Sequence, residues 1–171
     1  LSIDDQLIAR RILGVSENLG RGIPRPRQPD LQIVNDEGLV YLSRWQVIPR
    51  NVCGANVYFH VQTLSDPDLP LHDHPWPSTS VILSGGYYEK LQREPPHGDV
   101  IGYLRQTGQT IFRQQHEAHR LILPVGQPYS MSLFTTGPDV GKRWGFWIKG
   151  KWYDSRECKQ HTDLGASRFH Y

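Results

Sequence analysis

The chain has 171 residues, of which 37% are hydrophobic and 21% are charged, a length typical of one domain with a core of its own. Lysine and arginine number 19 against 17 acidic residues, giving a net charge of +2, and this balance argues against a nucleic-acid partner. No window approaches the run of about 18 apolar residues that spans a membrane, so no membrane partner is expected.

The start of the sequence and its cysteines bear on the cellular compartment. The segment Leu1–Asp5 lacks the basic and apolar regions of a secretory signal peptide. Cys53 and Cys158 are too few for a disulfide framework. Both observations favour a reducing, cytoplasmic location.

The first 30 residues are predicted to hold a helix and an irregular arm. Ser2 followed by Asp5 is typical of a helix start, and Leu7, Ile8 and Ile12 follow at helical spacing, which predicts a helix over 3–13. Residues 20–29 are basic and rich in proline, which indicates an extended connector over the surface.

Residues 31–153 are predicted to form a β-barrel, and 154–171 a polar tail without clear periodicity. Short β-like segments alternate with turn residues, and 29 glycines and prolines (16 and 13) supply the turns. Such spacing is typical of a β-sandwich or barrel. The predicted strands are 38–48, 55–64, 78–91, 99–104, 109–113, 119–124, 128–136 and 143–148.

Three histidines carry the strongest chemical signal. His72 and His74 point to the same face of an extended segment, with Cα atoms roughly 6.5 Å apart. His119 supplies a third imidazole from a segment distant in sequence. Three imidazoles from two strands can hold a metal ion and leave coordination positions open, although a His-x-His pair alone is more typical of two solvated loop histidines.

The histidine segments resemble the paired motifs of the cupin superfamily. His72 and His74 match the His-x-His of the first motif, and Gly85 matches its final glycine. Gly108 and His119 match the glycine and histidine of the second motif. The sequence departs from the family where Ser78 stands at the glutamate position, Gln114 at the proline, His116 at the glycine and Leu123 at the asparagine.

This resemblance implies an all-β fold, a single-domain cupin double-stranded β-helix (a small β-barrel or jelly roll) with a short N-terminal helix. It implies a divalent metal on His72, His74 and His119. Thiol dioxygenases are cupins that also lack the glutamate and hold Fe(II) with three histidines. The segments HDHPW, SGGY, HRL and WGFW are most similar to a group of bacterial and phage cupins, a resemblance that implies no particular reaction.

The resemblance implies a non-heme oxidoreductase, an Fe(II)-dependent dioxygenase that acts with O2 on a small organic substrate. Zn, Mn, Ni and Cu stay open, since three imidazoles suit several ions. The alternatives are a 2-oxoglutarate-dependent oxygenase, and an isomerase-type or non-catalytic cupin that binds a small molecule. A homodimer also stays open.

Residues near the histidines are candidates for substrate contacts. Arg120 or Arg143 would bind an acidic substrate group through paired N–H donors. Side chains of aromatic residues would form the walls of the pocket: Tyr58, Tyr87, Trp76 and Trp144.

Three further residues near the motif are expected to lie outside the metal site. Asp73 is expected on the face opposite to the two histidines, as a turn residue or a support for the ligands. His116 is expected at the mouth of the site. His60 faces the same side as Tyr58 and Gln62 and could reach the barrel interior, but an ordinary core or surface histidine is favoured.

Overall fold

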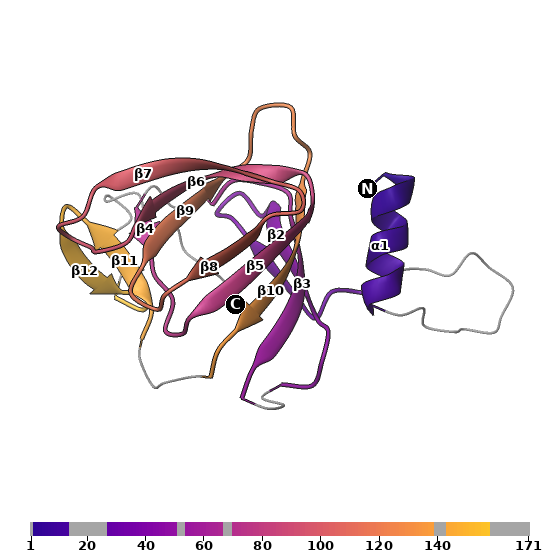
Figure 1. Ribbon diagram of the computed structural model, residues 1–171, viewed down its shortest axis with the longest axis horizontal. Coiled ribbons are helices and arrows are strands. Elements are labelled where there is room, and N and C mark those ends of the chain that lie inside the picture. The colour runs from indigo at the N-terminus through magenta and orange to yellow at the C-terminus, as the bar shows by residue number, and fades with distance from the viewer. Residues whose placement is uncertain (1, 14–26, 51–53, 67–69, 139–142, 158–171) are drawn as a thin grey trace, which may run out of the picture.

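The computed structural model describes residues 2–13, 27–50, 54–66, 70–138 and 143–157. Most of the predicted Pro-rich arm, most of the predicted tail, and both cysteines lie outside these residues. Within them the chain forms one helix and two six-stranded sheets (Figure 1). The expected all-β architecture with a short N-terminal helix is therefore confirmed.

Both sheets are antiparallel throughout. The first sheet has the order β1 (Leu31–Val34), β2 (Val40–Gln46), β3 (Asn56–Gln62), β10 (Ser130–Thr136), β5 (Ser78–Ser84) and β8 (Thr110–Arg113). The second sheet has the order β12 (Lys151–Asp154), β11 (Gly145–Ile148), β4 (Leu71–His72), β9 (Ala118–Ile122), β6 (Gly86–Gln92) and β7 (Val100–Gln106). Each of the eight predicted strands overlaps an observed one, whereas β1, β4 and β12 were not predicted.

The predicted strand over 78–91 is two strands, because the chain turns a corner at Gly85 and Gly86. β5 ends at Ser84 in the first sheet, and β6 begins at Gly86 in the second. Both glycines have positive φ angles, 72° and 149°, which side chains disfavour. A Cβ on Gly86 would also lie 2.2 Å from the carbonyl oxygen of Arg105. The corner thus requires glycine and connects the two sheets directly.

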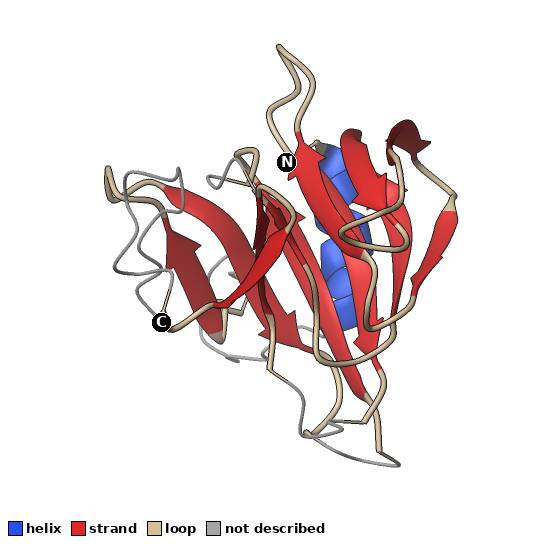
Figure 2. Cartoon of the chain, turned by 90° about the vertical axis from the view of Figure 1, so that its left-hand side faces the viewer, coloured by secondary structure: helices blue, strands red, loops and turns tan. Residues whose placement is uncertain are grey.

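Helix α1 (Ile3–Leu13) has the predicted bounds. Its first turn is capped by Ser2, whose hydroxyl accepts the N–H of Asp5 at 3.1 Å and donates to the Asp5 carboxylate at 2.6 Å. Ala9 packs in a buried cluster with Phe59, Val61 and Met131. The helix consequently covers the outside of β3 and β10 (Figure 2).

Strands β3 and β10 have an apolar outer face and a partly polar inner face. Phe59, Val61 and Met131 face α1, so alternation turns His60 and Ser130 the other way, toward the cavity that they line. This arrangement brings polar side chains into the interior between the sheets, where the candidate site lies.

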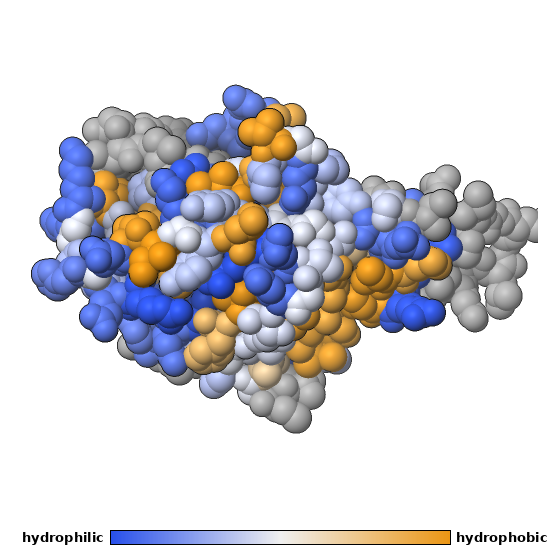
Figure 3. Space-filling view, turned by 45° about the horizontal axis from the view of Figure 1, so that its top comes forward, coloured by the Kyte–Doolittle hydropathy of each residue, from blue (hydrophilic) through white to orange (hydrophobic). Residues whose placement is uncertain are grey.

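The outer surface of the second sheet carries exposed apolar side chains. Several large apolar side chains on β7 are exposed, among them Val100, Ile101 and Leu104, and Figure 3 shows hydrophobic surface interspersed with hydrophilic surface on one face. Among the described residues no helix has the length and apolar character needed to cross a membrane.

Candidate metal centre

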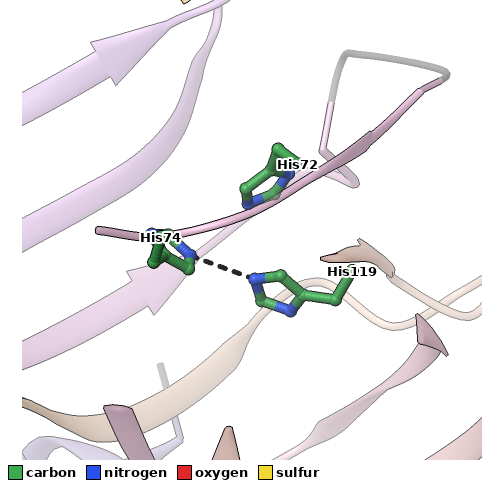
Figure 4. A group of neighbouring side chains, drawn as sticks. All are labelled: His72, His74 and His119. Carbon is green, nitrogen blue, oxygen red and sulfur yellow. Dashed lines mark hydrogen bonds between the residues drawn. The ribbon is translucent and has the colours of Figure 1, made fainter. Parts of the chain in front are cut away.

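The three predicted histidines come together between the sheets. His72 on β4 is the Cα partner of His119 on β9, and His74 follows two residues after His72. One ring nitrogen from each residue lies within 4.8 Å of the others. The Nε2 atoms of His74 and His119 are 3.0 Å apart and share a hydrogen bond (Figure 4). The cluster is compact enough for its three nitrogens to bind one ion.

Glu89 on β6 fixes the orientation of His119. The Nδ1–H of His119 donates to Oε1 of Glu89 at 3.2 Å, because a carboxylate of this kind only accepts. The lone pair of a neutral His119 is therefore on Nε2, which faces the other two rings. A carboxylate in this position orients a metal-binding imidazole and increases its basicity.

Burial keeps the histidines neutral. It lowers the pKa of His72 to about 4, helped by the nearby charge of Arg113, and burial with Arg113 likewise lowers the pKa of His119 to about 4. The pKa of His74 lies well below its usual value, through burial and the neighbouring His119 and His72. Neutral imidazole is the form that binds metals.

Glu89 is the centre of a buried ionic network. Its carboxylate pairs with Nε of Arg113 at 2.5 Å and with Nε of Arg105 at 2.7 Å. Although burial alone raises the pKa of Glu89, the hydrogen bond from His119 and the charge of Arg113 lower it overall. Arg113 also donates to the hydroxyls of Ser80 at 3.0 Å and Tyr87 at 3.2 Å. Glu89 was not predicted as a site residue, although its alternation with Tyr87 in β6 indicated an inward position.

The histidines open onto a cavity of about 260 Å³. Its wall contains side chains from both sheets, and the predicted wall residues Trp76, Trp144 and Tyr87 are among them. Tyr58 is not among them; its ring stacks beside that of His60 with centroids 6.0 Å apart, and the guanidinium carbon of Arg44 lies 4.8 Å from its ring centre. A cavity of this size, near the lower end of the usual range for ligand pockets, suits a small molecule.

The two arginines expected to contact substrate do not line this cavity. Arg120 follows His119 in β9, so alternation turns it to the opposite face, where it donates to the backbone oxygen of Asp66 at 3.4 Å. Arg143 is mostly exposed and pairs with Asp154 at 3.0 Å. The arginines that do line the cavity are Arg44 and Arg113.

The expected position of the family glutamate also needs correction. Ser78 is buried but does not line the cavity, whereas Ser80 does. Residues 75–77 separate His74 from the start of β5. The first residue of β5 whose side chain lines the cavity is therefore Ser80, two positions after the one that the motif spacing predicted. At the cavity wall the Ser80 hydroxyl accepts a hydrogen bond from Arg113.

Asp73 supports the histidine segment, as the alternation predicted. Its carboxylate accepts three N–H groups, from the Gly145 backbone at 2.8 Å and from the indoles of Trp152 at 2.9 Å and Trp147 at 3.3 Å. It thereby connects the end of β4 to β11 and β12 and is not part of the histidine cluster.

Two other histidines differ from expectation. His116 is exposed and does not line the cavity. His60, expected to be an ordinary core or surface residue, lines the cavity and accepts the Nε–H of Arg44 at 3.0 Å. Strand alternation allowed an interior position for His60 but did not favour it, because its contact with Arg44 depends on the pairing of β2 with β3.

Comparison with known proteins identifies the fold. No protein-family model and no curated protein sequence matches the chain. The structure is similar to that of FeII HppE in complex with substrate, with a TM-score of 0.51 and 16% identity over 73% of this chain and 65% of that one. It is also similar to the DMSP lyase DddQ from Ruegeria pomeroyi DSS-3, with a TM-score of 0.50 and 14% identity over 65% of this chain and 54% of that one.

These neighbours are cupin-fold proteins, and the chain has the cupin fold. It spans less than two thirds of the length of either neighbour. The described residues thus have the cupin fold, with a cluster of three histidines that could hold a metal ion.

Proposed function

We propose that this chain is a metal-dependent cupin enzyme in which His72, His74 and His119 hold Fe(II), and that it oxidises a small organic substrate with O2. The observation that carries the proposal is the convergence of three imidazole nitrogens within 4.8 Å at the wall of a cavity of about 260 Å³. Three ligands leave coordination positions open for reactants.

The donor set fits a divalent ion. All three imidazoles are neutral at neutral pH, and Glu89 directs the lone pair of His119 toward the other two rings. Imidazole suits Fe, Zn, Cu and Ni, and the fold neighbour HppE, which is named as an FeII protein, supports iron.

Bound Fe(II) supplies the capacity to activate O2 and to polarise a substrate oxygen or sulfur. The chain supplies the surroundings. Trp144 and Phe134 line the cavity and exclude water from part of it. Tyr87 also lines the cavity, and its hydroxyl oxygen accepts an N–H from Arg113, so the phenol is held at a defined position from which it can exchange a proton with a substrate.

A second function is a lyase or isomerase reaction without O2. The similarity to DddQ, which is named as a DMSP lyase, favours this candidate. There the ion would act only as a Lewis acid, and Tyr87 would serve as acid or base. Redox-inactive Zn(II) would then support turnover, which it cannot do in the oxidative reaction.

The test combines metal analysis with O2 consumption. Elemental analysis of the purified protein and of protein refilled anaerobically with Fe(II) is expected to give stoichiometric metal. Small thiols and hydroxy acids are then screened for O2 uptake, with and without 2-oxoglutarate. Uptake with one of them supports the proposal, uptake that requires 2-oxoglutarate changes the class to a 2-oxoglutarate-dependent oxygenase, turnover without O2 supports the lyase or isomerase, and failure to bind metal overturns all three.

A further inference from the structure

The two sheets end in four edge strands, of which β7 is the longest. β1, β8 and β12 have four residues each, whereas β7 has seven. β7 pairs with β6 over its whole length without a register shift. No described strand lies on its other side, at the margin of the molecule (Figure 1). The backbone N–H and C=O groups on that side are therefore available to pair with a further strand.

β7 lacks the features that normally keep an edge strand from pairing with another chain. Natural edge strands are short, or carry lysine, proline or a bulge. The sequence of β7, VIGYLRQ, contains neither lysine nor proline. Its apolar side chains Val100, Ile101 and Leu104 are 52%, 47% and 55% exposed. A long, regular and apolar edge of this kind indicates a surface that another strand covers.

The sequence of β7 is complementary to itself in the antiparallel direction. When two copies pair about a two-fold axis at Gly102, Val100 lies opposite Leu104 of the second copy, and Ile101 lies opposite Tyr103 of the second copy. Directly opposite side chains share one face of an antiparallel pair and contact each other. Moving the axis by one residue, to Ile101 or Tyr103, would place Gly102 opposite Val100 or Leu104 and lose these contacts.

The same register brings opposite charges together. Asp99, which is exposed and directly precedes β7, lies opposite Arg105 of the second copy, on the same face. Within the described residues Asp99 has no hydrogen bond or ion pair. Arg105 is 17% exposed and shares the Glu89 carboxylate with Arg113, so these three ion-paired groups have a net charge of +1. Asp99 of the second copy balances that charge.

We propose that two copies of this chain pair through β7, antiparallel and centred on Gly102, so that their second sheets form one continuous sheet of twelve strands. A second copy is the occupant because one edge supplies both members of each apolar pair and of the pair between Asp99 and Arg105. The proposal does not depend on metal binding. It places the interface close to the candidate metal centre, since Arg105 pairs with Glu89 and Glu89 with His119.

Sedimentation equilibrium of the full chain measures the association. The wild type is expected to be a dimer at concentrations on the order of 10 µM. Leu104→Lys is expected to weaken the dimer at least about tenfold, because a charged side chain then lies opposite Val100 of the second copy. Leu39→Lys is the matched control, since Leu39 is 51% exposed and lies outside β7, and its dimer is expected to be unchanged. Far-ultraviolet circular dichroism checks that both variants fold.

Substitutions of Asp99 test the charge pair in the same measurement. Asp99→Lys is expected to weaken the dimer about tenfold or more, because two positive charges then lie opposite each other. Asp99→Glu keeps the charge and is expected to keep most of the association. Asp99 is exposed and has no described partner within its own chain, so neither variant is expected to change the fold of a single copy.

Disulfide crosslinking tests the register, in protein that also carries Cys53→Ser and Cys158→Ser. Val100→Cys combined with Leu104→Cys is expected to give a disulfide-linked dimer on oxidation, whereas either change alone is not. Within one copy the two positions are about 13 Å apart, too far for an internal disulfide. A wild type that stays monomeric up to about 100 µM, a dimer that either lysine variant at Leu104 or Asp99 leaves intact, or equal crosslinking of the single and double cysteine variants would overturn the proposal.

Discussion

Ser78 and Ser80 lie two residues apart on β5 and are both buried, but their hydroxyls have different surroundings. The Ser78 hydroxyl has no hydrogen-bond partner, whereas the Ser80 hydroxyl accepts an N–H of Arg113 at 3.0 Å. Ser78→Ala is expected to leave the free energy of unfolding unchanged or to raise it by up to about 1 kcal/mol, and Ser80→Ala to lower it by about 1–3 kcal/mol.

Urea unfolding of both variants checks this prediction, and metal content gives a second readout. Ser78→Ala is expected to retain its metal, since Ser78 does not line the cavity. A strong loss of stability or of metal in Ser78→Ala would mean that its hydroxyl has a role that its surroundings do not indicate.

The proposed metal ligands can be tested one at a time. His72→Ala and His74→Ala are each expected to abolish stoichiometric metal binding while the far-ultraviolet circular dichroism of the β-sheets is retained, because two imidazoles rarely hold a divalent ion tightly. His116→Ala is the matched control, since His116 is exposed and outside the cluster. A full metal complement in either ligand variant, measured by elemental analysis, would contradict the assignment.

The buried ionic network is tested by a substitution of Glu89. Glu89→Gln removes the only charge that balances Arg113 and Arg105 in the described network. The expected loss in the free energy of unfolding is about 3–5 kcal/mol, typical of a buried charge left without its partner, and metal affinity is expected to fall about 10–100-fold. Glu37→Gln, in an exposed turn, is the control. If Glu89→Gln kept the stability and the metal affinity of the wild type, the network would not be needed for either property.

At the scale of elements, α1 is required to cover the apolar outer face of β3 and β10. Ala9, 7% exposed, packs on Phe59, Val61 and Met131, while Leu7 on the same helix is 49% exposed. Ala9→Glu is expected to lower the free energy of unfolding by about 2–4 kcal/mol, because a charge replaces a methyl group in an apolar contact. Leu7→Glu is expected to change it by less than about 0.5 kcal/mol.

Thermal unfolding and binding of a hydrophobic dye check this prediction. Ala9→Glu is expected to increase dye binding, since the outer face of the two strands becomes accessible. Similar behaviour of the two helix variants would indicate that α1 does not depend on this contact.

For the whole molecule, the buried histidines make stability depend on pH. His72 and His119 have a pKa of about 4 in the folded chain, against 6.5 when solvated. Between these values the unfolded chain binds more protons than the folded chain, so the free energy of unfolding of the metal-free protein is expected to fall as pH decreases from 6.5 to 4. Above that window these two groups are neutral in both states and contribute no pH dependence.

Urea titrations across this range measure the effect. Bound metal is expected to decrease over the same pH range, because protons compete for the same nitrogens. A free energy of unfolding that stays constant from neutral pH to about pH 5 would contradict the burial of neutral histidines.

Features that depend on residues close together in sequence could be predicted, whereas features that depend on strand pairing could not. The helix at 3–13, most strands and the three histidines followed from local periodicity and motif spacing. Arg44, His60 and Glu89 were not identified as site residues, because their positions depend on which strands pair and in what register. Arg120 was chosen for its place beside His119, although strand alternation already directs adjacent residues to opposite faces.

The ionic network around Glu89 also constrains how the site can change over evolution or in a redesign. One carboxylate holds His119, Arg113 and Arg105 at once, and Arg113 in turn holds Ser80 and Tyr87 on the cavity wall. Substitutions in such a network are not additive. New metal or substrate preferences are therefore reached more readily by substitutions outside the network, for example at Ser132 or Leu42, which line the cavity. Replacing the charged members of the network one at a time would leave a buried charge without its partner and destabilise the fold.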